Sequence, residues 1–247
     1  AGFLMKQFAL DRADVYRVPG IVNLVRLNQV PDWVERPDLK YRSFRPAQPK
    51  ELAKGDNIFA SVRKQDILLH HPFQSFEPVI GLLKAAADDP AVVAVNVADY
   101  RTGTDSVLME HLVRAAQKGK EVTVVVELMA RFDEEANIGW AAQLEEVGAH
   151  VVYGVVGYKT HAKMLLVVRR ENGGLRRYVH LGTGNYHPRT TRFYTDFGLL
   201  TANEEIGADV AEVFKQLTGL GQAGKLKHLW QAPFTLQPNV VAAIREE

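Results

Sequence analysis

The stretch that decides the fold, residues 157–200, reads GYKTHAKMLLVVRRENGGLRRYVHLGTGNYHPRTTRFYTDFGLL. Between residues 159 and 192 it carries eight Lys and Arg residues against a single acid, Glu171, and three of the chain's eight histidines. Because the whole chain has 30 basic and 29 acidic residues, positive charge is concentrated here and cancelled elsewhere. A cationic segment with interleaved imidazoles suits a polyanionic ligand such as phosphate. A solvated surface hairpin is the alternative interpretation of the charge alone.

The pattern around His161 predicts two strands joined by a tight turn. His161 and Lys163 open an apolar run, residues 164–168, that is too short and too rich in Val and Leu for a helix and is typical of a buried strand. Because strand side chains alternate between faces, His161 and Lys163 should point the same way. The ENGG segment at residues 171–174 indicates a hairpin turn, after which residues 176–181 should form the second strand.

The second strand should deliver Gly182-Thr183-Gly184-Asn185 back beside the start of the first strand. Its glycines permit close backbone approach to an anion, and Asn185 can orient an imidazole or a phosphate oxygen. A histidine and a lysine on one strand face, with a Gly-rich turn and an Asn about twenty residues later, resemble half of a phospholipase-D-type active site. That family's phosphodiesterases carry an Asp five residues after the lysine, and here the position is Val168.

Longer stretches of the chain resemble the large, ATP-linked polyphosphate kinase family. They are HHPFQSFEPV (70–79), YRTGTDS (100–106), ELMARFDEEANI (127–138), VVYGVVGYKTHAKM (151–164), HLGTGNYHPRTTRFYTDFGLLT (180–201) and GKLKHLWQAPF (224–234). The resemblance runs from about Asp11 onward and corresponds to the family's first C-terminal catalytic domain. It implies that this chain is a piece of the enzyme, without the family's amino-terminal, head and second phospholipase-D-like domains.

The order of the predicted elements along the chain indicates an α/β fold that follows an N-terminal lead-in segment. Residues 1–65 should be a linker segment from the absent head domain, because residues 31–50 carry four prolines and many charges; a surface loop is the alternative. Residues 66–247 should form the phospholipase-D-like catalytic half-domain. Its predicted strands, 66–70, 91–97, 121–128 and 150–156, alternate with predicted helices, 76–88, 105–119 and 133–147, and Asn203 should cap a last amphipathic helix that ends at about Leu217. This alternation predicts a mixed sheet flanked by helices on both faces.

Ligands of such sheets gather at the carboxyl ends of strands, and the sequence places basic side chains there. Arg101 follows the second predicted strand, Arg131 follows the third, and His161 lies beyond the fourth. Three elements should therefore send cationic or nucleophilic groups toward one rim. If each arginine is considered without the other groups, an ion pair at the surface is the alternative to a role in binding a ligand.

The family resemblance implies a role for each of these residues. His161 becomes phosphorylated, and Lys163 is its charge-stabilising neighbour. Arg101 and Arg131 occupy the family's magnesium neighbourhood; since arginine is a poor metal ligand, we expect both to bind phosphate oxygens while Mg²⁺ is held mainly by nucleotide and water. Tyr194 matches the family's nucleotide-contacting tyrosine and could stack on the base, a core aromatic on a strand being the alternative.

Other titratable residues receive weaker assignments. His180 is a secondary candidate that could act on phosphate, although a hydrogen-bonded structural role is favoured, and His70 and His71 should be structural. No pair of His or carboxylate residues has convincing metal-ligand spacing. The chain has no cysteine, and no apolar run approaches the roughly 20 residues of a membrane span. These features fit a cytoplasmic protein, with peripheral attachment at the inner membrane face left open.

The expected reaction is reversible transfer of the ATP γ-phosphate to inorganic polyphosphate through a phosphohistidine at His161, with ADP released. The full-length enzyme should be a homo-oligomer. Phospholipase-D-like sites need two facing halves, so this chain alone should be weak or inactive. The segment Asn96-Val97-Ala98-Asp99 and Met129 depart from the family pattern, which could change substrate preference or rate.

Two alternatives to a kinase stay open. One is a phospholipase-D-type phosphodiesterase built by pairing two copies of the half-site. The other is a non-catalytic module in which the basic hairpin binds polyphosphate or nucleic acid.

Overall fold

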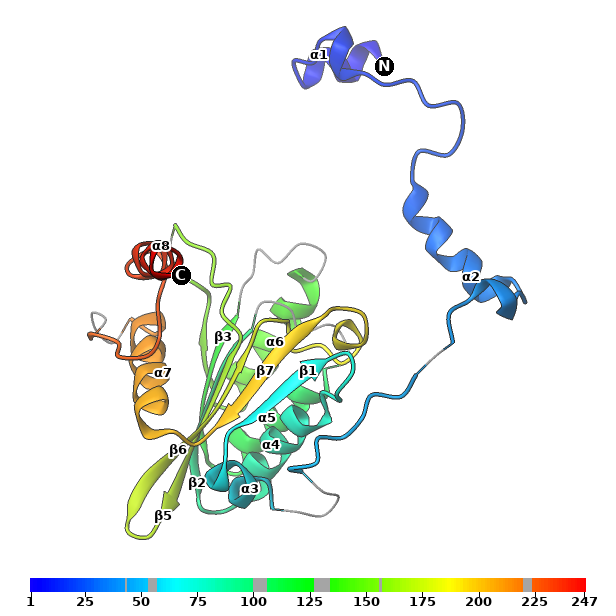
Figure 1. Ribbon diagram of the computed structural model, residues 1–247. Helices are drawn as coiled ribbons and strands as arrows, with labels where there is room; N and C mark the ends of the chain where they lie inside the picture. The colour runs from blue at the N-terminus through cyan, green and yellow to red at the C-terminus, as the bar shows by residue number, and fades with distance from the viewer. Residues whose placement is uncertain (43, 53–56, 100–105, 127–133, 156, 220–223) are drawn as a thin grey trace. The chain divides into compact units, whose positions relative to one another are not determined.

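The computed structural model describes residues 1–42, 44–52, 57–99, 106–126, 134–155, 157–219 and 224–247, without the side chains of residues 99 and 134–137 (Figure 1). The chain divides into two compact units, Ala1–Phe44 and Arg45–Glu247. The predicted boundary of the catalytic half-domain near residue 65 stays a prediction.

The first unit consists of short helices without a core. They are α1 (Gly2–Gln7), η1 (Arg12–Asp14), η2 (Leu24–Gln29), α2 (Val30–Trp33) and η3 (Pro37–Leu39). None of the described residues of this unit is buried. Prolines at residues 31 and 37 lie at the starts of α2 and η3, where a missing N–H costs little. The unit therefore has local hydrogen bonding but no packed interior of its own.

The second unit is built on a mixed sheet. Its described strands are β1 (Ile67–His71), β2 (Val92–Asp99), β3 (Glu121–Val126), β4 (His150–Val152), β5 (Met164–Glu171), β6 (Gly174–Gly182) and β7 (Asp196–Thr201), in the order β1-β7-β6-β5-β2-β3-β4. The β2–β3 and β3–β4 pairs are parallel, and the other neighbouring pairs are antiparallel. The predicted mixed sheet is confirmed.

Helices cover both faces of this sheet, as predicted (Figure 1). The described helices are α3 (Ile58–Lys64), α4 (Glu77–Asp88), α5 (Val107–Gln117), α6 (Glu134–Glu146), α7 (Glu204–Leu217) and α8 (Leu236–Glu246). One core cluster joins α4 and α5 to the sheet and includes Leu165, while a second joins α7 to the sheet and includes Met164 and Leu166. Strand β5 is thus buried on both faces, which explains its continuous apolar sequence.

Local signals account for several element boundaries. The side chains of Asn57, Ser106 and Asn203 accept backbone N–H bonds at the starts of α3, α5 and α7. Asn172 and Gly173 both have positive φ, at 47° and 79°, which matches the twist of the tight β5–β6 hairpin. The hairpin and the Asn203 cap are therefore confirmed.

The predicted strand 150–156 is too long, and one strand was missed. β4 ends at Val152, because Gly154 turns the chain with φ of 63° and Val155 bridges back to Tyr158. Strand β7 was absent from the predicted elements, although it separates β1 from β6. Its pairing brings Gly198 opposite Gly182 and Asp196 opposite His71. One rim of the sheet therefore holds the ends of β1, β2, β3 and β6 and the starts of β5 and β7.

The β5–β6 turn lies at the end of the sheet opposite this rim. There Glu171 is the centre of a network of ion pairs and hydrogen bonds. Its carboxylate, 7% exposed, accepts bonds from Arg169 Nη1 at 2.7 Å and Tyr178 Oη at 2.7 Å, and pairs with Arg176 Nε at 3.2 Å. Burial opposes ionisation of Glu171, but the bonds from Tyr178 and Arg169 lower its pKa below the ordinary value. Cations of the basic segment thus stabilise the hairpin at a site remote from His161.

Glu171→Gln should lower the free energy of unfolding by about 2 kcal/mol, because charge-assisted bonds to a nearly buried carboxylate are lost. Asp88→Asn is the matched control: Asp88 pairs with Arg114 and Lys118 but is 43% exposed, so its loss should cost about 0–1 kcal/mol. Urea unfolding of both variants measures the difference. Equal effects would contradict the assignment of Glu171 as the anchor of the hairpin.

Candidate active site

His161 and Lys163 lie at the rim, just before β5 begins at Met164. His161 is exposed, whereas Lys163 is only 4% exposed and its Nζ donates to the backbone oxygen of His161 at 2.7 Å. Partial burial, and then the positive charges of Lys163 and Lys159, lower the pKa of His161 below its ordinary value. His161 therefore presents a neutral imidazole at the surface close to a cationic side chain, and such an imidazole can act as a nucleophile toward an anionic substrate.

The Gly-rich turn returns beside Lys163, as predicted. The N–H of Gly182 donates to the Lys163 oxygen at 2.9 Å. Thr183 Oγ1 then donates to Asp196 Oδ1 at 2.9 Å. A Cβ at Gly184 would lie 2.2 Å from Asp196 Oδ2, so the missing side chain at this position makes room for the carboxylate. Asp196 therefore adds a carboxylate at the edge of the turn.

Asn185 and Tyr194 have different environments. Asn185 is half-buried, and its backbone oxygen accepts from the His187 N–H at 2.8 Å. Tyr194 precedes β7 and is 65% exposed, so the alternative of a core aromatic on a strand is wrong. Its ring is accessible for stacking, while a contact with nucleotide stays a prediction.

His180 lies beneath the turn, two residues before the end of β6, and is 1% exposed. Its Nδ1 lies 2.6 Å from the hydroxyl of Tyr186. Burial, with a smaller effect of nearby His71, lowers the pKa of His180 to about 3. His180 is therefore neutral near pH 7 and is removed from solvent, which fits the favoured structural role. His71 is buried too, with Nδ1 2.9 Å from the Gln74 oxygen.

Several predicted positions lie outside the described residues. Arg101, Arg131 and Met129 belong to this group. The segments that carry the two arginines follow β2 and β3, whose ends are at this rim. Two of the β2 residues that depart from the family pattern are buried: Val97 lies in the core cluster with α4 and α5, and Ala98 lies in the core cluster with α7.

Sequence reasoning missed Asp196 and Tyr186 as parts of this site. Both belong to the 180–201 stretch, but their importance depends on cross-strand contacts: Asp196 with Thr183, and Tyr186 with His180. The glycines at 184 and 182 were the available signal, since a Cβ at Gly184 would lie against Asp196 and a Cβ at Gly182 would lie 3.4 Å from Tyr186 Cε1.

The sheet, with His161, Lys163 and the Gly-rich turn at its rim, has the phospholipase-D-like fold. The crystal structure of Nuc from Salmonella typhimurium, a phospholipase D family member, matches with a TM-score of 0.50 and 17% identity, covering 65% of this chain and 98% of that chain. This likeness concerns the fold.

The chain belongs to the polyphosphate kinase family: residues 57–223 match the family model described as polyphosphate kinase C-terminal domain 1. Polyphosphate kinase from Burkholderia ambifaria (strain MC40-6) is 61% identical over 248 residues, 99% of this chain and 36% of the relative. The enzyme of Neisseria meningitidis serogroup B is 60% identical over 245 residues. The crystal structure of polyphosphate kinase from Porphyromonas gingivalis matches with a TM-score of 0.79 and 32% identity, covering 94% of this chain and 38% of that chain. This chain thus spans about 36% of the length of its curated relatives.

The free energy of unfolding should decrease as the pH is lowered from about 7 to about 5. The pKa of His180 is about 3 in the folded chain against an ordinary 6.5, so the unfolded chain binds the additional proton in this range. One such group gives a slope of up to about 1.4 kcal/mol per pH unit, with stability rising as pH rises. Urea unfolding across this range tests the sign, and a flat or falling dependence on pH would contradict it.

Proposed function

We propose that the full-length protein containing this chain transfers the γ-phosphate of ATP reversibly to inorganic polyphosphate and releases ADP, with His161 as the residue that carries the phosphoryl group. One observation supports this proposal most: His161 has an exposed side chain whose pKa is lowered, and its backbone oxygen accepts a bond from the buried Nζ of Lys163. Membership of the polyphosphate kinase family provides the substrates.

In the first step, an imidazole nitrogen of His161 attacks the γ-phosphorus of ATP. The N–P bond forms as the bond from the γ-phosphorus to the bridging oxygen breaks, and ADP leaves with that oxygen. Lys163 is placed to offset negative charge on the transferred group, and a preorganised cation of this kind commonly contributes about a hundredfold or more in rate.

In the second step, a terminal oxygen of polyphosphate attacks the phosphorus, and the N–P bond breaks. The chain is lengthened by one phosphate and His161 becomes neutral again. Two displacements with a covalent intermediate replace one direct transfer between two polyanions. Asn185 would contact phosphate oxygens from the Gly-rich turn, Tyr194 would stack on the adenine, and Arg101 and Arg131 would bind further phosphate oxygens.

Mg²⁺ would accompany the nucleotide. Among the residues that the structure describes, no group of three His, Cys, Asp or Glu side chains could hold a metal ion. The described donors therefore do not fit a protein-held site, and we propose ligation mainly by phosphate oxygens and water in the neighbourhood of Arg101 and Arg131.

The two alternatives receive less support from the geometry. Val168 packs against the α7 core cluster, so β5 has an apolar side chain where a phosphodiesterase would carry its acid. In the binding-module hypothesis the basic hairpin would bind a polyanion, but Arg169 and Arg176 pair with Glu171 at the far end of the sheet. A kinase half-site is the better interpretation.

Assembly and location stay proposals from the family resemblance: a second phospholipase-D-like half that completes the site, a homo-oligomer, and a cytoplasmic enzyme. In the described part of the chain, no helix combines the length and the apolar character needed to cross a membrane.

Incubation of the full-length protein with γ-labelled ATP and Mg²⁺ should place acid-labile label on His161, and this chain alone should take little. His161→Ala should abolish the label, and Lys163→Met should slow labelling by about a hundredfold. His150→Ala is the matched control, since His150 is an exposed histidine at the start of β4, away from the rim.

Two results would overturn the proposal: label that persists in His161→Ala, or label that maps to another residue of the full-length protein. Release of phosphate from a diester substrate by the full-length protein, without labelling from ATP, would favour the phosphodiesterase instead.

A further inference from the structure

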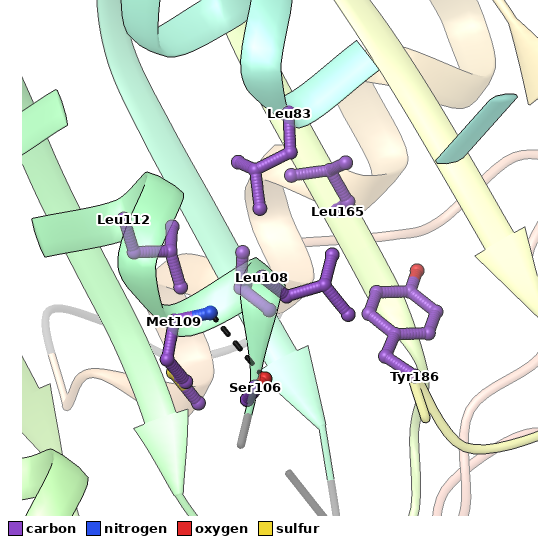
Figure 2. Close-up of a pocket in the computed structure, with 8 residues that line it drawn as sticks. Leu83, Ser106, Leu108, Met109, Leu112, Leu165 and Tyr186 are labelled. Atoms are coloured by element: carbon purple, nitrogen blue, oxygen red, sulfur yellow. Dashed lines mark hydrogen bonds between the residues drawn. The ribbon is translucent and has the colours of Figure 1, made fainter. Parts of the chain in front are cut away.

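Tyr186 directly follows Asn185 and is anchored in the core. It is 2% exposed, and its ring centroid lies 5.9 Å from that of Phe76 and 5.2 Å from that of His180. Figure 2 shows the ring on one side of a small cavity whose other lining residues include Leu108 and Leu165; its volume is about 10 Å³. A cavity of this size holds at most one water molecule, so the ring has little room to move.

The hydroxyl of Tyr186 binds one residue at two points. Tyr186 Oη lies 2.6 Å from His180 Nδ1 and donates to the backbone oxygen of His180 at 3.3 Å. His180 is itself fixed, because it pairs with Leu165 of β5 on one side and Leu200 of β7 on the other. Tyr186 is therefore bound to a strand that is paired on both sides.

Two glycines make room for this pair. A Cβ at Gly182 would lie 3.2 Å from His180 Cε1 and 3.4 Å from Tyr186 Cε1. A Cβ at Gly198 would lie 2.6 Å from His180 Nε2. The glycines therefore do more than admit an anion: they allow His180 and Tyr186 to pack beneath the turn.

The Gly-rich turn needs such support, because glycine backbones lose more conformational freedom on ordering than any other residue. The turn is held at its outer edge by the bond that Thr183 Oγ1 donates to Asp196 Oδ1. It is held at its inner edge by Tyr186 and His180. Between the two lies Asn185, whose position depends on both.

We infer that Tyr186 is a positioning residue for the phosphoryl transfer: through its hydroxyl contacts with His180, it fixes the backbone of Asn185 and of the Gly-rich turn, whose first residue bonds to Lys163. This inference rests on the proposed function. Since small displacements of a positioning group can slow a reaction strongly, loss of the hydroxyl contacts with His180 should affect turnover more than substrate binding.

The test compares two tyrosines of the full-length enzyme. Tyr178 offers a matched control: it is fully buried in β6, and its hydroxyl donates to one side chain, Glu171, at the opposite end of the sheet. Tyr186→Phe and Tyr178→Phe each remove one buried hydroxyl, so both should lower the unfolding midpoint. Below both midpoints, Tyr186→Phe should reduce kcat about tenfold or more with KM for ATP within about twofold, whereas Tyr178→Phe should leave both constants unchanged.

A second pair of variants keeps the inference testable if Tyr186→Phe fails to fold. In His180→Asn the amide takes the place of Nδ1 and can still bond Tyr186, whereas in His180→Gln it reaches toward the position of Nε2. His180→Asn should therefore retain more kcat than His180→Gln.

Either of two results would overturn the positioning role while leaving His161 as the phosphate carrier. One is a wild-type kcat in folded Tyr186→Phe. The other is a kcat in His180→Gln that equals or exceeds the kcat in His180→Asn. Absence of label on His161 in the wild-type full-length enzyme would overturn the proposed function, and the inference with it.

Discussion

The pairing of β5 with β6 is the constraint on which the rest of the structure depends. Strand β5 lies between β6 and β2 and contributes side chains to both core clusters, so a shift of one residue in its register would exchange the two faces. The tight turn at Asn172 and Gly173 sets the register of this pair. At the end of the hairpin away from the turn, the same register brings the Gly182 N–H to the Lys163 oxygen. The same pairing that builds the core therefore also assembles the rim.

Charge is divided between the two ends of the hairpin. At the turn, the guanidinium groups of Arg169 and Arg176 are neutralised by Glu171 and stabilise the fold. At the rim, Lys163 is buried beside an imidazole whose pKa is lowered, so the local environment favours an incoming anion. Positive charge of this segment thus lies at both ends of the hairpin, and in the proposed function only the charge at the rim would bear on catalysis.

Much of the fold could be predicted from the sequence, because its signals are local: the alternation of strands and helices, the Asn203 cap and the ENGG turn are each decided within a few residues. The end of β4 and the existence of β7 could not, since they depend on a glycine of positive φ and on pairing across the sheet. The same division holds for the site. His161 and Lys163 follow from a short motif, whereas the contacts of Asp196 with Gly184 and of Tyr186 with His180 need the strand register.

The central claim is that His161 carries the phosphoryl group on the route from ATP to polyphosphate. A rapid-quench single turnover of the full-length enzyme with γ-labelled ATP and Mg²⁺ tests it most directly. Acid-labile label on His161 should form at least as fast as steady-state turnover and then pass quantitatively into polyphosphate. Label that forms more slowly than turnover, or that stays on the protein while polyphosphate grows, would contradict it.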